Sequence, residues 1–312
     1  MSQKNLEQKS AVAKAMADKL SEGLLFLDGA MGTQLMAKGI EPGKCNEYLN
    51  VESPKIILDI HRSYFQAGSD AVLTNTFGAN EITLARHNLA DKVEQINRAA
   101  VKIARQAAGR DKFVIGDIGP CGDFLKPLGI LEPERLKDAF AKQAKALCDG
   151  GVDGFIIETM TAVDEAKIAV EAVKSVCPLP MFVSFAFDAA GSDFRTMMGA
   201  SVETIVSEFS TLGVKAIGFN CGTLKMEQYS LLAERFVKLL AGKNILLLAE
   251  PNAGKPELID DRAVYKIGDE EFAEWLARIH KAGAAIIGGC CGTTPEHIKA
   301  MTKKLSNRPF VL

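Results

Sequence analysis

The segment Ala285-Ile286-Ile287-Gly288-Gly289-Cys290-Cys291-Gly292-Thr293-Thr294-Pro295 contains the unit from which the fold is built. A short apolar run, typical of a buried strand, leads into a glycine turn, and Thr294 then caps a helix whose first residue is Pro295. Similar apolar runs recur along the chain, and their continuous apolarity is typical of strands buried on both faces of a parallel sheet. The eight predicted strands are Leu24–Leu27, Ala71–Thr74, Phe113–Ile118, Gly154–Ile157, Met181–Ala186, Ala216–Phe219, Ile245–Ala249 and Ala285–Ile287.

Segments with helical spacing separate these strands. From Pro54 to Ala67, for example, Ile57, Ile60 and Tyr64 recur at steps of three and four residues. The other predicted helices are Lys92–Ala108, Glu134–Leu147, Val163–Val176, Val202–Leu212, Met226–Leu240, Phe272–Ala282 and one that begins at Pro295. Strand and helix alternating eight times predict an α/β fold, a single (β/α)8 barrel of the TIM type. A doubly wound open sheet is the alternative, because the pattern alone does not show closure.

We divide the chain into an N-terminal helical extension, residues 1–22, and the β/α barrel, residues 23–312. In the extension Ala13, Met16 and Leu20 share one helical face, and we expect this helix to cover part of the bottom of the barrel. No linker-like or low-complexity segment interrupts the series of strands and helices. Its longest break is a loop after the first strand, residues 36–53.

The composition excludes several classes of protein. The chain has 312 residues, 47% of them hydrophobic and 24% charged, and a net charge of −2. This balance provides no basic field for nucleic acid, and no window approaches the roughly 18 apolar residues of a membrane span. The N-terminus carries charges throughout, unlike a secretory signal. We therefore expect a cytoplasmic enzyme or binding protein whose seven cysteines are thiols, metal ligands or catalysts rather than a disulfide framework.

Three cysteines lie at strand ends, which is where β/α barrels carry their chemistry. Cys221 follows the sixth predicted strand, and the adjacent Cys290 and Cys291 follow the eighth. Strands two apart in a closed barrel are near in space, so the three sulfurs can converge. Adjacent residues of a regular strand face opposite sides, so aiming both Cys290 and Cys291 at one point needs the backbone freedom of the three glycines in their turn. Three thiolates with one open position are typical of catalytic zinc, and soft thiolates argue against magnesium or calcium.

Other interpretations of the cysteines stay open. The three could be buried apolar thiols in tight turns, or the glycine turn and the helix after it could form a phosphate cradle, as in a phosphate-binding barrel lyase. Cys148 and Cys177 are interpreted as packing residues on or beside helices, Cys45 lies in the long first loop, and Cys121 is a spare candidate ligand. No pattern supports a zinc site built from the histidines, which are His61, His87, His280 and His297.

Two carboxylates, Asp28 and Glu158, also follow apolar strands and are expected to face the mouth of the barrel. They suit an ammonium group, and the backbone amides from Gly29 to Thr33 are placed to hold a carboxylate, which together would make an amino-acid pocket. As alternatives, the two carboxylates act as general acid and base, or Asp28 is a cap or turn residue.

At this point the chain resembles the homocysteine S-methyltransferase family, over roughly residues 20 to 305. The matching segments are Asp28-Gly29-Ala30-Met31-Gly32-Thr33, Thr74-Asn75-Thr76-Phe77, Ile157-Glu158-Thr159, Gly218-Phe219-Asn220-Cys221 and Gly288-Gly289-Cys290-Cys291-Gly292-Thr293-Thr294-Pro295. The resemblance implies a zinc-dependent barrel that methylates homocysteine to methionine. It implies that Cys221, Cys290 and Cys291 hold Zn2+, and that Asp28 and Glu158 contact the ammonium group of homocysteine. The substrate-binding residues expected from it are Asp28, Gly29, Ala30, Met31, Glu158 and Asn220.

Within the family, Pro251-Asn252-Ala253-Gly254 with Pro256 is most similar to the homocysteine-binding module of cobalamin-dependent methionine synthase. The expected donor is therefore methylcobalamin, a methyl-corrinoid carried by a separate protein or module and not bound by this chain alone. S-methylmethionine and S-adenosylmethionine are the alternative donors. Betaine is disfavoured, because the only tryptophan, Trp275, lies in a predicted helix and not in an aromatic cage. A zinc- or thiol-binding module whose turnover needs a missing partner is a further alternative.

Overall fold

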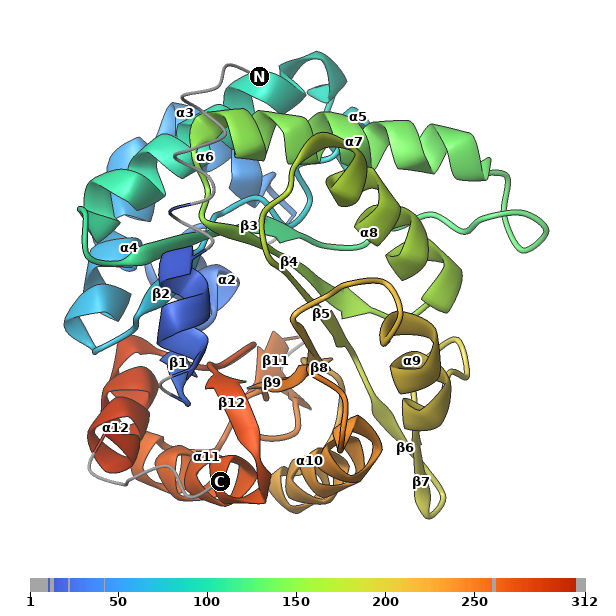
Figure 1. Cartoon of the computed structure of the whole chain (residues 1–312). Helices are drawn as coiled ribbons and strands as arrows, with labels where there is room; N and C mark the ends of the chain where they lie inside the picture. Colours follow the sequence, from blue (N-terminus) through green and yellow to red (C-terminus); the bar gives the residue numbers. More distant parts are fainter. Residues whose placement is uncertain (1–10, 12–13, 22, 42, 260–261, 307–312) are drawn as a thin grey trace.

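The computed structural model describes residues 11, 14–21, 23–41, 43–259 and 262–306. Its centre is a sheet of eight parallel strands in the order β1-β12-β9-β8-β5-β4-β3-β2, with helices around the outside (Figure 1). All eight predicted strands are confirmed, with small shifts at their ends. They are β1 Leu25–Phe26, β2 Ala71–Leu73, β3 Phe113–Ile118, β4 Gly154–Met160, β5 Met181–Phe185, β8 Ala216–Asn220, β9 Leu246–Glu250 and β12 Ala284–Ile287.

Hydrogen bonds from residues that flank β1 and β2 bring the two ends of this sheet together. The Asp70 amide donates to the Phe26 carbonyl at 2.7 Å, and the Phe26 amide donates to the Asp70 carboxylate at 3.1 Å. Further along, the Asp28 carboxylate accepts the Leu73 amide at 3.2 Å. The sheet is a nearly closed barrel of the TIM type, and the doubly wound open sheet considered as the alternative is wrong.

The predicted helices are present at the predicted places. They are α4 Pro54–Gln66, α6 Val93–Ala108, α7 Pro133–Gly150, α8 Val163–Val176, α9 Val202–Phe209, α10 Met226–Leu240, α11 Asp269–Ala282 and α12 Pro295–Leu305. Thr294 precedes α12 in an extended conformation, but its hydroxyl contacts His297 Nδ1 at 3.0 Å and caps no helix amide.

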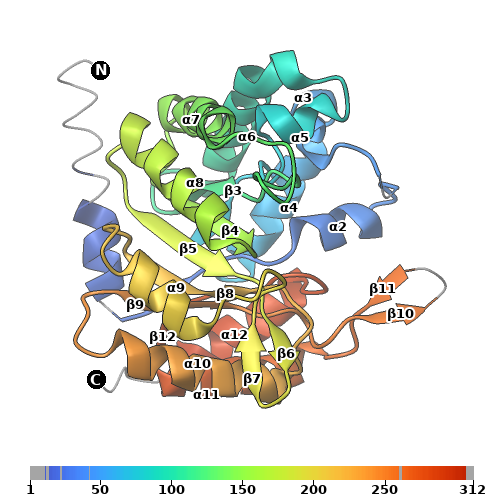
Figure 2. The same ribbon diagram turned by 90° about the vertical axis from the view of Figure 1, so that its right-hand side faces the viewer.

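Short elements fill the long connections after the strands. The loop expected over residues 36–53 holds the end of α2 Met31–Ala37, the 3-10 turn η1 Asn46–Tyr48 and α3 Leu49–Glu52, and after β2 come α5 Glu81–Ala85 and η2 Ala90–Lys92. Two hairpins of three-residue strands, which the sequence analysis does not predict, are β6 Asp188–Ala190 with β7 Asp193–Arg195 and β10 Glu257–Ile259 with β11 Arg262–Val264. In Figure 2, α2 and the β10–β11 hairpin project from the same side of the barrel.

The apolar core has two layers. The larger lies between the barrel and its helices, and the smaller fills the barrel interior with side chains such as Leu25, Ile115, Ile156 and Phe182. Met16, from the helical residues 14–21, is fully buried in the interior layer. The helix therefore covers the bottom of the barrel as predicted, although Ala13 lies outside the described residues.

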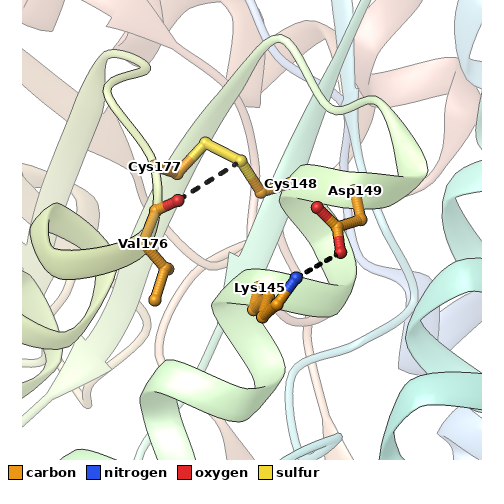
Figure 3. The surroundings of a disulfide bond; sticks show 5 residues. All are labelled: Lys145, Cys148, Asp149, Val176 and Cys177. Carbon is orange, nitrogen blue, oxygen red and sulfur yellow. Dashed lines mark hydrogen bonds and ion pairs between the residues drawn. A yellow bond between two sulfur atoms is a disulfide. The ribbon is translucent and has the colours of Figure 1, made fainter. Parts of the chain in front are cut away.

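The prediction of free thiols is wrong for two cysteines. Cys148, in the last turn of α7, and Cys177, directly after α8, form a disulfide (Figure 3). They are 29 residues apart in sequence, but α7 and α8 follow neighbouring strands and pack side by side, so their C-terminal ends meet. Each residue is almost fully buried, as expected of a packing residue, but the spacing along the chain does not show that two helix ends coincide.

Among the helices of the described residues, none combines the length and the apolar composition that crossing a bilayer requires.

Candidate metal and substrate site

Three sulfur atoms converge at the C-terminal end of the barrel. Cys221 directly follows β8, Cys290 and Cys291 come shortly after β12, and β9 lies between these two strands. The Cys291 sulfur lies 3.9 Å from that of Cys221 and 3.9 Å from that of Cys290. All three sulfurs lie within 4.8 Å of one another, and in the described part of the chain they are the only such group of potential metal ligands. We refer to Cys221, Cys290 and Cys291 as the sulfur cluster.

Irregular backbone aims these side chains. Cys221 has a φ of 52°, which an L-residue rarely adopts, and its carbonyl accepts a hydrogen bond from the Tyr229 hydroxyl. In the turn after β12, which holds Cys290 and Cys291, Gly292 is the only glycine with a positive φ, which is 81°. Gly288 and Gly289 serve close packing instead, because an added Cβ would lie 2.9 Å from the Asp28 carbonyl oxygen or 2.6 Å from Thr293. The conformational freedom predicted for all three glycines is thus used at one of them.

One member of the sulfur cluster carries negative charge most readily. The pKa of Cys291 is lowered to about 3, because the Cys221 and Cys290 thiols and the Tyr265 hydroxyl all donate hydrogen bonds to its sulfur. The pKa of Cys290 is raised, because its thiol is a donor to both neighbours and is buried. A polarised group of thiols with a thiolate at its centre is suited to binding a soft cation.

Four of the carboxyl groups that line the same cavity lie at the C-terminal ends of barrel strands, and we call Asp28, Asp117, Glu158 and Glu250 the carboxyl cluster. Glu41 and Glu47, from the connection after β1, line the cavity as well. Asp117, Glu158 and Glu250 point into the barrel, because side chains two residues apart on a strand face the same side. The residues two positions before them are Ile115, Ile156 and Leu248, which belong to the interior core layer. Asp117 lies at the end of the predicted strand Phe113–Ile118 and Glu250 directly follows the predicted strand Ile245–Ala249, but neither is among the predicted site residues. Side chains alternate between the two faces of a strand, so counting two residues on from the inward-facing apolar side chains could have identified Asp117 and Glu250.

Burial governs the electrostatics of the carboxyl cluster. It raises the pKa of Glu158 to about 7 and those of Asp28, Asp117 and Glu250 well above their usual range, in each case as the largest cause. Mutual repulsion adds to this effect, because Asp117 feels the charge of the other three carboxyl groups. The cavity that they line has a volume of about 950 Å3, and its described lining contains no lysine, arginine or histidine.

Asn220, at the end of β8, connects the two clusters. Its side-chain amide donates to the Glu158 carboxylate, to Thr159 Oγ1 at 2.6 Å and to the Cys290 sulfur at 3.8 Å. Its side-chain oxygen accepts the Thr159 amide at 2.8 Å and the Ser184 hydroxyl at 2.7 Å. Asn220 thus fixes the position of Glu158 relative to the sulfurs.

The segment Gly29–Thr33 lines the cavity at the start of α2, but not every amide in it is available. The Ala30 amide donates to Thr293 Oγ1 at 3.1 Å, and the Ala30 carbonyl accepts from the Tyr64 hydroxyl at 3.0 Å. The amides of Met31, Gly32 and Thr33 belong to the first turn of α2, where no helix carbonyl can accept them. A carboxylate held here would therefore contact these three amides and not that of Ala30.

Comparison with known proteins shows the family to which this chain belongs. Residues 25–305 match the family model described as homocysteine S-methyltransferase. The chain belongs to the homocysteine S-methyltransferase family. Two relatives named methionine synthase, from Mycobacterium tuberculosis and Mycobacterium leprae, are each 34% identical over 94% and 91% of this chain. The alignments cover only 25% and 24% of those relatives, so the chain spans about a quarter of their length.

Solved structures show the same fold for this family member. The metallated form of the homocysteine methyltransferase MmuM from Escherichia coli aligns with a TM-score of 0.76 at 24% identity, over 94% of this chain and 99% of that one. A methyltransferase from Methanosarcina mazei aligns with a TM-score of 0.60 at 11% identity, over 94% of this chain and 97% of that one.

The remaining candidate ligands of this family member lie apart from the sulfur cluster. The Cys121 sulfur contacts the backbone of Asp123, and the Cys45 sulfur contacts Glu47, so neither joins the three sulfurs. None of the four histidines joins the metal-ligand group of the described residues. His61 is buried in α4, His280 lies in α11, His297 in α12 and His87 just after α5.

Proposed function

We propose that this chain transfers a methyl group to the sulfur of homocysteine and so forms methionine. The observation that carries the proposal is that the sulfur cluster and the carboxyl cluster face one cavity and are joined by Asn220. Homocysteine has a thiol at one end and an ammonium and a carboxylate at the other. The cavity offers chemistry suited to each of these groups.

Zinc fits the donor set of the sulfur cluster. Sulfurs bound at about 2.3 Å to one tetrahedral ion lie roughly 3.8 Å apart, and the two sulfur contacts made by Cys291 are both 3.9 Å. Zinc, when bound, would hold the substrate sulfur as a thiolate at neutral pH and so make it a nucleophile. Three protein ligands leave a position for that sulfur, as in catalytic zinc sites.

The chain's own residues would bind and orient the rest of homocysteine. Glu158, held by Asn220, and Asp28, held by the Leu73 amide, are the acceptors proposed for the substrate ammonium. The first-turn amides of α2, beginning with Met31, are proposed for its carboxylate. No side chain has to act as a general base in this scheme, which agrees with the lack of histidine in the described lining of the cavity.

We further propose a protein-borne methyl-corrinoid as the donor. The relatives that cover nearly the whole chain are named methionine synthase, and three quarters of their length lies outside the match. Most exposed large apolar side chains of the described residues lie between a barrel strand and the following barrel helix, that is, on the face of the barrel where the cavity opens, and Met36 and Phe77 line the cavity itself. The exposed apolar side chains on this face are Met36, Phe77, Phe124, Leu128, Ile130, Met197, Met198, Leu258 and Ile259. An apolar rim of this kind suits contact with another protein or domain, which a small donor would not need.

Two alternatives have less support. The only tryptophan, Trp275 in α11, stacks with Arg278 at 4.3 Å and lines no part of the cavity. The aromatic side chains of the described lining are Phe77 and Tyr265, so a cage for the quaternary ammonium of betaine would lack tryptophan, the ring that binds such a cation best. A phosphate-binding lyase would place a dianion beside the carboxyl cluster with no lysine or arginine in the described lining to offset the charge.

The test measures bound zinc and the formation of methionine from homocysteine with methylcobalamin, S-methylmethionine, S-adenosylmethionine and betaine in parallel. We expect one zinc ion per chain and turnover with methylcobalamin, with the Cys45→Ser variant as a control that removes a cysteine outside the sulfur cluster. Turnover with a sulfonium alone would replace the proposed donor. Intact thiols without metal would contradict the proposal as a whole and favour the phosphate-binding alternative.

A further inference from the structure

The carboxyl cluster presents a problem of charge that the proposed function leaves unsolved. The four carboxyl groups of this cluster, with Glu41 and Glu47 besides, face a cavity whose described lining has no basic side chain, whereas homocysteine brings one ammonium group. Carboxylates that repel one another in a buried site do not all ionise. At least one of the four must therefore be neutral, and the hydrogen bonds around the cluster indicate which.

The side chains of Asp117 and Glu158 lie close enough for a hydrogen bond between the two carboxyl groups. Two carboxyl groups can form such a bond only when one of them is protonated, because an ionised carboxylate has acceptors and no donor. Strand pairing brings them together, since β3 and β4 are neighbours and Asp117 pairs with Ile156, two residues before Glu158. The two residues share one proton and one negative charge.

The other partners of the pair decide where the charge lies. Glu158 accepts from the Asn220 side-chain amide and from the Thr159 hydroxyl, which stabilise an ionised carboxylate. Asp117 is 5% exposed, and its Oδ1 is buried without a hydrogen-bond partner. The charge therefore belongs on Glu158 and the proton on Asp117.

The surroundings of Asp117 support the same assignment. The facing ionisable groups are Asp28 from β1, Glu158 from β4 and Glu250 from β9, which are all acidic. The neighbouring β2 and α7 contribute only neutral groups, since Thr74 Oγ1 accepts the Asp117 amide and the Gln143 side chain donates to its carbonyl. Burial, followed by the charge of Glu158, raises the pKa of Asp117 well above its usual range.

We propose that Asp117 is a protonated positioning residue that donates a hydrogen bond to Glu158 and so orients the one carboxylate that receives the ammonium group of the substrate. This inference rests on the proposed function for the identity of the substrate. The neutral form of Asp117 itself does not depend on that function.

The test compares Asp117→Asn with Asp117→Ala in the zinc-loaded full chain. Asparagine is neutral and can donate the same hydrogen bond, so we expect the Kd for homocysteine to stay within about threefold of the unmodified value. Alanine removes the donor, and we expect a rise in Kd of about tenfold or more. The acid limb of the pH profile of binding should also move to higher pH in Asp117→Ala only, because Glu158 loses a donor that stabilises its ionised form. Asp123→Asn, which removes an exposed carboxylate outside the cavity, is the matched control.

Equal losses in the asparagine and alanine variants would overturn the proposal, because they would show that Asp117 acts as an ionised carboxylate. Unchanged affinity in both would overturn it as well. A second measurement separates this outcome from failure of the proposed function. In 13C NMR of aspartate-labelled, ligand-free protein, the signal that Asp117→Asn removes should be that of a protonated carboxyl at pH 7. A chain that shows this signal but does not bind homocysteine would contradict the proposed substrate and not the neutral state of Asp117.

Discussion

The sulfur cluster and the carboxyl cluster are built in different ways, although they face the same cavity. Cys221, Cys290 and Cys291 lie in turns beyond their strands, where a φ of 52° at Cys221 and 81° at Gly292 departs from extended backbone. Asp117 and Glu158 lie on paired strands and continue the inward-facing side of the barrel interior. The half proposed to bind the metal thus depends on special turns, whereas the half proposed to bind the substrate depends on the regular alternation of strands. Substitutions should therefore separate the two halves.

The largest expected effect comes from the sulfur cluster. Cys290→Ser should lose zinc and reduce methyl transfer by about a thousandfold or more, because the substrate thiol would no longer be held as thiolate. The barrel should remain folded, since a catalytic metal seldom supplies the stability of the fold. Metal analysis, the methionine assay and circular dichroism test these points together. Wholesale unfolding would show instead that the cluster is structural.

In the carboxyl cluster, Glu158→Gln should separate substrate binding from metal binding. It replaces the proposed partner of the ammonium group by a neutral amide of nearly equal size, and we expect the Kd for homocysteine to rise by about ten- to a hundredfold. Zinc content should not change, because Glu158 is not part of the sulfur cluster. Equal losses of zinc and of homocysteine would remove the distinction between the two halves.

A change of pH should weaken ligand binding through the carboxyl cluster, by a smaller factor than the substitution of Glu158. The pKa of Glu158 is raised to about 7, so this carboxyl group becomes neutral as the pH falls through that value and then no longer pairs with an ammonium group. Binding of 2-aminobutyrate, which lacks the sulfur of homocysteine, should weaken by up to about tenfold for each pH unit below 7. Competition titrations from pH 5 to 8 measure this effect without a contribution from thiol ionisation. A flat profile would show that Glu158 does not bind the ammonium group.

Proton release should report on the sulfur side alone. Homocysteine should release about one proton on binding to the zinc-loaded chain, since its thiol must be deprotonated at the metal. Calorimetry at about pH 8, above the pKa of Glu158 of about 7, in two buffers with different heats of ionisation measures the release, and 2-aminobutyrate should release almost no proton there because Glu158 is already ionised. Equal release by both ligands would assign the proton to the carboxyl cluster instead.

The smallest effect on the site is expected from the disulfide between the ends of α7 and α8. The Cys148→Ala, Cys177→Ala double variant should lower the free energy of unfolding by about 3 kcal/mol, because the unfolded chain regains the freedom of the closed loop. Homocysteine affinity should remain unchanged, since neither residue lines the cavity. Chemical denaturation and calorimetry of the same samples compare the two quantities.

Much of the architecture could be predicted from local pattern. The eight apolar runs and the helical segments between them correspond to the strands and helices of the barrel, because burial on both faces and the helical period each leave a signal in neighbouring residues. The three-residue hairpins were missed, since strands as short as β6 and β10 carry too few residues to show alternation. The disulfide was missed because two helix ends 29 residues apart in sequence meet only in the folded chain.

The sequence by itself determined the strand-turn-helix units, the membership of Cys221, Cys290 and Cys291 in strand-end turns, and the placing of Asp28 and Glu158 at the mouth. Only the tertiary structure decided that the sheet closes, that the Ala30 amide is already bound to Thr293, and that Asp117 and Glu158 lie beside each other on paired strands. The physical reason is the range of the interactions. Periodicity, capping and turn formation act between neighbours along the chain, whereas closure, hydrogen-bond partners and protonation depend on residues that only the completed barrel brings together.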